Sequence, residues 1–205
     1  MFTGIVTDMG KVVSIVPFGD SIKFSVVTTQ KNYLKKNKTG QSMAINGACM
    51  TIENIKDNCF NFTTIKESLS KTNLGDLRKG SYVNLEKPMV MNATLDGHIV
   101  QGHVDTTGIV TKIIKLQDSW DYFIKFPSVF RNNIIYVGSI AVNGISLTIA
   151  DIVIESKKEI TIKVSIIPHT FKVTNFKYLK PNDKVNLEFD MLGKYVKRVL
   201  KKDLK

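Results

Sequence analysis

An internal repeat constrains the fold of this chain more than any other feature of its sequence. Segments of the first half return in the same order in the second half, at offsets of 104, 97 and 102 residues. Changes in loop length between duplicated units produce such small differences in offset. The paired segments are residues 3–6 with 107–110, 42–52 with 139–149, 72–73 with 174–175, and 83–86 with 185–188. We therefore expect two similar units, residues 1–97 and 98–190, followed by a tail, residues 191–205.

Each unit has the sequence pattern of short β-strands joined by tight turns. Residues 11–16 and 159–164 are rich in β-branched side chains and roughly alternate between apolar and polar, as half-buried strands do. The clearest turn signals are Asn46-Gly47 and Asn143-Gly144, because Asn-Gly readily adopts the positive φ angles of a two-residue hairpin. We expect an all-β fold of two tandem, similar, six-stranded Greek-key-type β-barrels.

Short helices complete the predicted architecture. One helical turn is expected to begin near Ser68 and an equivalent one near His169. A longer helix is predicted from Met191 to Leu204, where apolar side chains recur at helical spacing beside lysines. The apolar positions are Leu192, Val196, Val199 and Leu200, and the lysines are Lys194, Lys197, Lys201 and Lys202. A helix of about three or four turns is only marginally stable alone, so we expect this tail to mediate oligomerisation.

The composition excludes several classes of protein. No apolar run approaches the roughly 20 residues that a membrane helix needs, and the first residues lack a secretory or transit signal. We therefore expect a cytoplasmic protein without membrane association. Cys49 and Cys59 are too few for a disulfide framework. The net charge of +11 suggests a polyanionic partner, but the lysines are scattered and only three arginines occur, so we expect no nucleic-acid partner.

Four segments carry a resemblance to a known family. They are Met-Phe-Thr-Gly-Ile-Val at residues 1–6, Asn-Gly-Ala-Cys-Met-Thr at 46–51, Gly-His-Ile-Val-Gln-Gly-His-Val-Asp at 97–105 and Asn-Gly-Ile-Ser-Leu-Thr at 143–148. With these motifs in this order and with its internal duplication, nearly the whole chain resembles the riboflavin synthase α-subunit family, which contains the lumazine-binding repeat.

The resemblance implies an activity and an assembly. Riboflavin synthases dismutate two molecules of 6,7-dimethyl-8-ribityllumazine by moving a four-carbon unit from one to the other. The products are riboflavin and 5-amino-6-(D-ribitylamino)uracil, and neither a metal nor an external redox cofactor is needed. In the family, the N-terminal barrel of one subunit faces the C-terminal barrel of its neighbour in a homotrimer. Association with a lumazine synthase is a further expectation.

The repeated motifs supply the groups that a ribityllumazine needs. Backbone groups suit the amide-like edge of its ring, apolar side chains suit the ring face, and hydroxyl and amide side chains suit the ribityl chain. By resemblance, the first pocket contains Gly4, Ile5, Val6, Cys49, Met50, Thr51, Thr63, Thr64, Ile65, Lys66, Glu67 and Ser68. The second pocket contains Gly102, His103, Val104, Ser146, Leu147, Thr148, Ser165, Ile166, Ile167, Pro168, His169 and Thr170, and Val137 is expected to contact substrate as well.

The chemistry needs a proton removed from the C7 methyl group of one ring and a nucleophile delivered to C7 of the other. His103 is the expected acid–base residue, because imidazole titrates near neutral pH. His98 lies five residues earlier, on the opposite face of an extended strand, and is interpreted as structural. Cys49 either attacks C7 or packs against the ring, and Ser146 takes its place in the second copy.

Three further residues are expected near the reacting centre by resemblance: Ser42, Thr148 and Asp190. Asp190 is equally suited to cap the tail helix. Thr148, like Thr51, is also consistent with an ordinary strand threonine.

Two departures from the family pattern and two rival functions stay open. The family commonly has a lysine where this chain has Val137, and frequently an aspartate where it has Asn143; a missing cation would weaken stabilisation of anionic intermediates.

A non-catalytic lumazine- or flavin-binding homologue would lose pocket residues in one copy, whereas residues 146–148 and 165–170 are kept here. A barrel that binds single-stranded nucleic acid needs aromatic side chains within a basic groove, and the aromatic run at residues 120–123 is flanked by aspartates.

Overall fold

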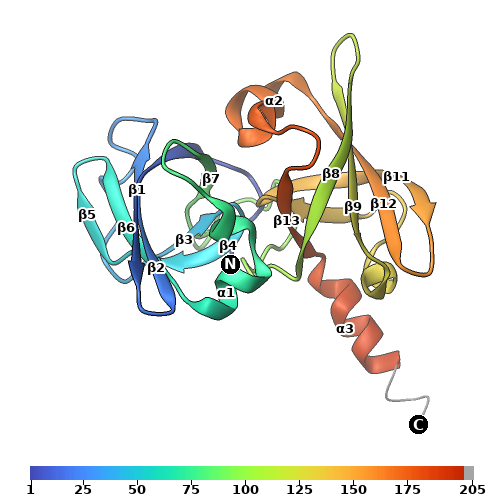
Figure 1. The fold of residues 1–205 in the computed structure, drawn as a ribbon, viewed down its shortest axis with the longest axis horizontal. Helices are drawn as coiled ribbons and strands as arrows, with labels where there is room; N and C mark the ends of the chain where they lie inside the picture. Colours follow the sequence, from blue (N-terminus) through green and yellow to red (C-terminus); the bar gives the residue numbers. More distant parts are fainter. Residues whose placement is uncertain (201–205) are drawn as a thin grey trace.

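The protein folds as two β-sheet units that lie side by side (Figure 1). The computed structural model describes residues 1–200. Helices α1 (Lys66–Lys71) and α2 (Pro168–Val173) lie on opposite sides of the pair of sheets, as an approximate twofold rotation between the units places them. They begin at Lys66 and Pro168, close to the predicted starts at Ser68 and His169.

Seven strands form the sheet of the first unit. In spatial order they are β4 (Ala48–Thr51), β3 (Ser42–Ile45), β7 (Tyr82–Glu86), β1 (Asp8–Phe18), β2 (Ser21–Thr28), β6 (Cys59–Thr64) and β5 (Asn54–Lys56). The 3₁₀ helix η1 (Asn73–Asp76) precedes β7. The two end strands, β4 and β5, are consecutive along the chain and are separated only by Ile52 and Glu53. The sheet therefore curls toward itself without a closing ladder.

Six strands of the second unit form a closed barrel. Their order is β10 (Ser139–Val142), β11 (Ile145–Glu155), β12 (Glu159–Ile166), β9 (Trp120–Pro127), β8 (Thr106–Lys115) and β13 (Lys184–Phe189). The 3₁₀ helices are η2 (Ser128–Asn133) and η3 (Asn175–Tyr178). Register shifts in β11 at Ile149/Asp151 and Ile152/Ile154 bend this strand, so that it pairs with both neighbours. The predicted six-stranded barrel is thus confirmed for the second unit, whereas the interruption between β4 and β5 leaves the first as a curled sheet.

Both predicted Asn-Gly hairpins are present. Asn46 and Gly47 join β3 to β4, and Asn143 and Gly144 join β10 to β11. The φ angles of these four residues are 47°, 78°, 46° and 77°. Positive φ at both loop residues is typical of the type I′ turn, which matches the twist of the flanking strands.

Each unit encloses its own apolar core. The first core is aromatic, with Phe24 and Phe62 stacked at a centroid distance of 5.1 Å. The second is rich in isoleucine, and the Tyr122 ring meets Phe176 edge to face. Burying one such side chain stabilises the fold by roughly 1.5–3 kcal/mol, so the two cores make rigid supports for the loops at their junction.

Six buried asparagines join the two units. They are Asn46, Asn73 and Asn84 from the first, and Asn143, Asn175 and Asn186 from the second. The Asn73 N–H donates to the Asn186 side chain at 2.6 Å, and the Asn175 N–H donates to the Asn84 side chain at 2.7 Å. Asn84 and Asn186 in turn donate to the backbone carbonyls of Asn143 and Asn46. The repeated Thr-Asn and Val-Asn-Leu-Glu segments therefore hold the units together.

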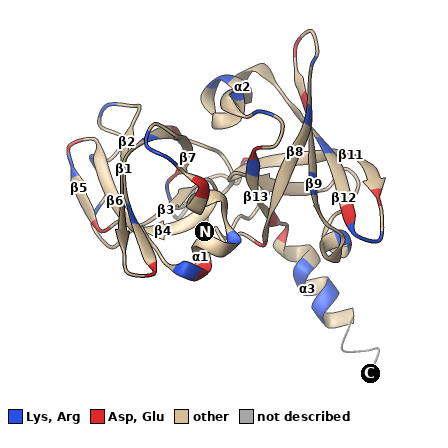
Figure 2. Ribbon diagram, viewed as in Figure 1, with Lys and Arg blue, Asp and Glu red and all other residues tan. Residues whose placement is uncertain are grey.

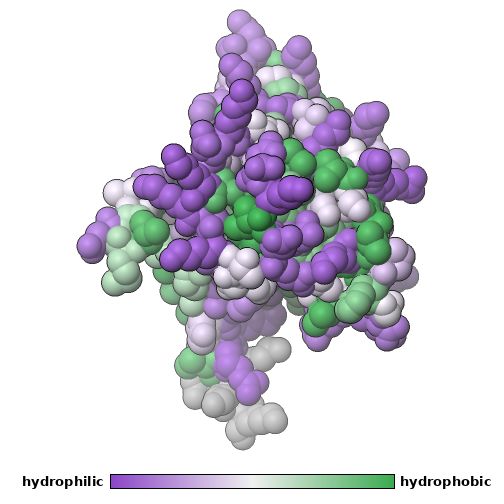
Figure 3. Space-filling view, turned by 90° about the vertical axis from the view of Figure 1, so that its left-hand side faces the viewer, coloured by the Kyte–Doolittle hydropathy of each residue, from purple (hydrophilic) through white to green (hydrophobic). Residues whose placement is uncertain are grey.

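Helix α3 (Met191–Leu200) leads away from the second unit and carries Lys and Arg on one side (Figure 2). Its apolar side chains are exposed, with Leu192 at 65% and Val199 at 60%, and hydrophobic and hydrophilic residues lie next to each other on this helix (Figure 3). The predicted positions Lys201, Lys202 and Leu204 lie outside the described residues. Within residues 1–200, no helix has the length and apolarity needed to span a membrane.

Candidate active site

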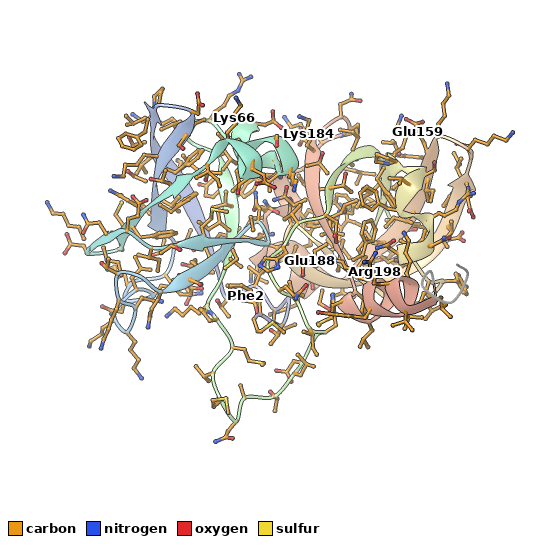
Figure 4. The ribbon with its side chains drawn as sticks, turned by 90° about the horizontal axis from the view of Figure 1, so that it is seen from below. Phe2, Lys66, Glu159, Lys184, Glu188 and Arg198 are labelled. Carbon is orange, nitrogen blue, oxygen red and sulfur yellow. The ribbon has the colours of Figure 1, made fainter. Side chains whose placement is uncertain are left out.

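Two buried glutamates hold equivalent loops at the junction of the sheets. Glu86 accepts hydrogen bonds from the backbone N–H groups of Thr3 and Gly4 at 2.7 and 3.1 Å. Glu188 accepts from those of Gln101 and Gly102 at 2.6 and 3.0 Å. Phe2 pairs with Val100, and Figure 4 shows Phe2 and Glu188 near the junction. Burial raises the pKa of both glutamates, although the hydrogen bonds oppose this rise.

These contacts correct one pairing of the internal repeat. Residues 3–6 are equivalent to residues 101–104, not to 107–110 as the sequence match indicates. Gly108 lies within β8 opposite Val185, as Gly10 lies within β1 opposite Val83. The Thr-Gly-Ile-Val identity is therefore a coincidence of short motifs. The recurrence of Glu at the end of Val-Asn-Leu-Glu was the signal for the glutamate-held loops, which sequence reasoning missed.

Each loop reaches across to the hairpin of the other unit. The Cys49 N–H donates to the Gly102 carbonyl at 2.9 Å, and the Ser146 N–H donates to the Gly4 carbonyl at 2.8 Å. A Cβ on Gly102 would lie 2.6 Å from the Cys49 Cβ, so only glycine permits this approach. The predicted grouping is therefore corrected: residues 102–104 lie with Cys49, and residues 4–6 lie with Ser146.

The first of the two resulting sites is a small pocket of about 170 Å³. It is lined by Ala48, Cys49, Met50, Glu67, Ser68, Lys71, Thr72, Gly102, His103 and Val104. His103 and Cys49, both predicted to be catalytic, thus line the same pocket. Lys71 and Glu67 form an exposed ion pair at 2.7 Å one turn apart on α1, and the Thr64 hydroxyl donates to the Met50 sulfur at 3.7 Å.

The second site contains a different set of side chains. By the twofold relationship, Ser146 replaces Cys49, Ile5 replaces His103, and His169 replaces Glu67. The Ser146 hydroxyl lies 2.7 Å from Nδ1 of His98, which is 8% exposed. Burial lowers the pKa of His98 below its ordinary value, and the charge of Asp190 opposes this shift. His98, interpreted from sequence as structural, therefore contacts a predicted catalytic residue.

Several of the remaining predicted residues lie at exposed positions. Ser42 lies opposite Thr51 in the first hairpin, as Ser139 lies opposite Thr148 in the second. Both threonines are exposed strand residues. The exposed residues Thr51, Ile65, Lys66, Thr148, Ser165, Ile167 and Pro168 lie outside the pocket of about 170 Å³ that Cys49 and His103 line.

Four predicted residues have side chains engaged elsewhere. The Thr64 and Ile166 side chains are fully buried, so any ligand contact they make is through the backbone. The Ser165 hydroxyl donates to Asp121 at 2.6 Å. Asp190 accepts from the Leu192 N–H at 2.9 Å, which is the capping arrangement. Its place near the reacting centre stays a prediction.

Val137 occupies an unusual position. It is 62% exposed, and its φ angle is 61°, a conformation that a β-branched residue rarely adopts. It belongs to neither the first pocket nor the Ser146–His98 contact.

The chain is similar to known proteins over nearly all of its length. The lumazine binding domain family matches residues 3–88 and 101–190. Riboflavin synthase of Actinobacillus pleuropneumoniae is 41% identical over 203 residues, covering 98% of this chain and 91% of that protein. Riboflavin synthase of Bacillus subtilis is 37% identical, with the same coverage of each.

Solved structures show the same architecture. LumP in complex with riboflavin superposes with a TM-score of 0.80 at 26% identity, covering 92% of this chain and 99% of that one. LumP in complex with 6,7-dimethyl-8-(1'-D-ribityl) lumazine gives a TM-score of 0.81 at 24% identity, with the same coverage. This second likeness supports the fold of the chain alone. Two copies of the lumazine-binding domain and full-length relatives at up to 41% identity mean that the chain belongs to the riboflavin synthase family.

Proposed function

We infer that the protein is a riboflavin synthase that converts two molecules of 6,7-dimethyl-8-ribityllumazine into riboflavin and 5-amino-6-(D-ribitylamino)uracil. The observation that carries this proposal is the duplicated backbone frame. Cys49 with Gly102, and Ser146 with Gly4, make the same N–H to carbonyl contact in two sites. A reaction between two copies of one molecule needs two binding sites of the same shape.

The differences between the sites support a division of chemical roles. His103 lies at the first pocket with Cys49 and serves as the acid–base residue for the C7 methyl proton. Cys49 and Ser146 occupy equivalent positions and meet the ring of each bound lumazine. The loops 4–6 and 102–104 supply backbone groups for the ring edge.

The assembly is proposed to be a homotrimer in the cytoplasm, where the free cysteines Cys49 and Cys59 stay as thiols. The first pocket, at about 170 Å³, is smaller than the 300 Å³ or so that ligand pockets usually offer, so a neighbouring subunit would complete it. The exposed apolar side of α3 supports the same proposal. Association with a lumazine synthase stays a prediction of the resemblance.

The rival function is a non-catalytic lumazine- or flavin-binding protein, as the likeness to LumP suggests. Such a protein needs one intact site. Here both sites keep the crossing loop, the hairpin and the following helix, which favours the enzyme.

Incubation of the purified protein with 6,7-dimethyl-8-ribityllumazine alone tests the proposal. We expect one riboflavin for two lumazines consumed, followed by absorbance and by product analysis. Tight binding of lumazine without riboflavin would establish the rival function, and absence of both would overturn the assignment. Cys49→Ser, assayed in parallel, separates the two roles of the thiol: unchanged turnover excludes an obligatory nucleophile, and lost turnover with retained binding supports one.

A further inference from the structure

The His98–Ser146 contact is unlike anything in the first site. Nδ1 of His98 lies 2.7 Å from the Ser146 hydroxyl, a normal length for a strong hydrogen bond. Within residues 1–200, the sulfur of the equivalent Cys49 has no hydrogen-bond partner. Within the described residues, the two similar units therefore present a hydrogen-bonded hydroxyl in one site and an unpaired thiol in the other.

The backbone around His98 is built to hold this contact. The His98 N–H donates to the Thr3 carbonyl at 3.1 Å, and the Ser146 N–H donates to the Gly4 carbonyl at 2.8 Å. A Cβ on Gly97 would lie 2.1 Å from the Thr3 carbonyl oxygen and 2.9 Å from the Ser146 Cβ. Only glycine at residue 97 lets the imidazole approach the serine this closely.

The imidazole is suited to hold the hydroxyl in one orientation. His98 is nearly fully buried, and the carboxylate of Asp190, which caps α3, acts on it electrostatically. Burial lowers the pKa of His98, so its ring is neutral near pH 7 and keeps one acceptor nitrogen.

We propose that His98 is a positioning residue for Ser146, which fixes the serine hydroxyl against the lumazine bound in the second site. The proposal rests on the proposed function. It gives the two identical substrate molecules chemically different surroundings, because only the second meets a hydroxyl whose rotamer is set by an imidazole. Such a difference is what a reaction with one donor and one acceptor molecule requires.

Three variants test the proposal. In His98→Asn the amide occupies the place of Nδ1 and can still bond Ser146, whereas in His98→Gln the longer side chain carries its amide past that point. Ser146→Ala removes the partner. We measure kcat and KM for riboflavin formation, the affinity for the second lumazine by fluorescence titration, and the thermal unfolding midpoint.

We expect His98→Gln and Ser146→Ala each to lower kcat and the second-site affinity by about tenfold, the value of one well-placed hydrogen bond. His98→Asn should stay within about threefold of the wild type, and the double variant His98→Gln/Ser146→Ala should be no worse than either single variant. Equal losses in His98→Asn and His98→Gln, or additive losses in the double variant, would mean a merely structural histidine and overturn the proposal.

The two readouts keep this proposal separate from the proposed function. If the wild type binds two lumazines but makes no riboflavin, the function fails, and the affinities of the four variants relative to the wild type still decide the role of His98. If the wild type turns over and the affinity and kcat patterns are additive, the function stands and the positioning role fails.

Discussion

Gly47 and Gly144 lie back to back at the centre of the approximate twofold axis. A Cβ added to Gly47 would lie 2.6 Å from the Gly144 nitrogen, and one added to Gly144 would lie 2.7 Å from the Gly47 nitrogen. Both residues also have positive φ angles. The turn signal that predicts each hairpin therefore also sets how closely the two hairpins, and with them the two sites, approach each other.

Gly47→Ala is expected to destabilise the protein by about 3 kcal/mol or more, because it adds a backbone clash to the cost of positive φ. Gly40→Ala is the matched control, since Gly40 has a φ angle of 87° with no atom within 4 Å of an added Cβ. The control should cost only about 1 kcal/mol. Urea unfolding of both variants measures the difference, and equal costs would show that the hairpins do not need this contact.

The buried glutamates predict a pH dependence of stability. Burial raises the pKa of Glu86 and of Glu188 above the ordinary value of a glutamate. The folded state therefore holds these protons to higher pH than the unfolded state, and the contribution of each group to stability falls as pH rises through its folded pKa. Between pH 5 and pH 7, the wild type should lose more stability than Glu86→Gln/Glu188→Gln.

Thermal unfolding of both proteins across this range measures that difference. The quantity compared is the slope of stability against pH in each protein. A loss of stability from weaker hydrogen bonds in the double variant is the same at every pH, so it does not change this slope. Parallel slopes would contradict the raised pKa values.

Val137 stores backbone strain on the surface. Its φ angle of 61° disfavours a β-branched side chain, whereas asparagine tolerates this conformation. Val137→Asn should stabilise the protein by about 1 kcal/mol against urea, with the Val137 N–H bond to the Ile149 carbonyl at 3.1 Å kept. Ile135→Asn makes the same change of polarity at an exposed neighbour without positive φ. An equal gain in both variants would trace the effect to polarity, not to strain.

The sequence repeat predicted the architecture because the same local turn, strand and helix patterns occur in both halves of the chain. The Asn-Gly turns, the strand patterns and the two short helices depend on a few adjacent residues, and all were found close to their expected places. The second unit closes into a barrel because β11 continues through its bulges. The first unit stays a curled sheet because its chain breaks after Thr51, between β4 and β5. No short motif encodes that difference.

The candidate site was predicted less completely, because its contacts join distant segments. Ser146 is 48 residues from His98 in sequence, and the loops 4–6 and 102–104 cross to the opposite unit. Residues 3–6 are identical to residues 107–110, so the sequence alone pairs these two segments. The structurally equivalent segment, residues 101–104, is less similar in sequence. Sequence similarity proposed the residues, whereas their grouping into two sites depends on contacts that only the fold creates.

Helix α3 carries the proposed trimer contact, and its two sides give a direct test. Leu192 and Val199 lie on the exposed apolar side, whereas Arg198 is one of the basic residues of the last turn. Burial of an apolar side chain contributes roughly 1.5–3 kcal/mol, and a carboxylate placed there would have to be desolvated. Leu192→Glu should therefore shift the assembly from three times the chain mass to the monomer in size-exclusion chromatography with light scattering, and turnover should fall with it. Arg198→Glu introduces the same acidic side chain on the basic side of α3 and should leave the mass unchanged. If both variants dissociate the assembly, the cause is the added charge. If neither does, the contact between subunits lies elsewhere.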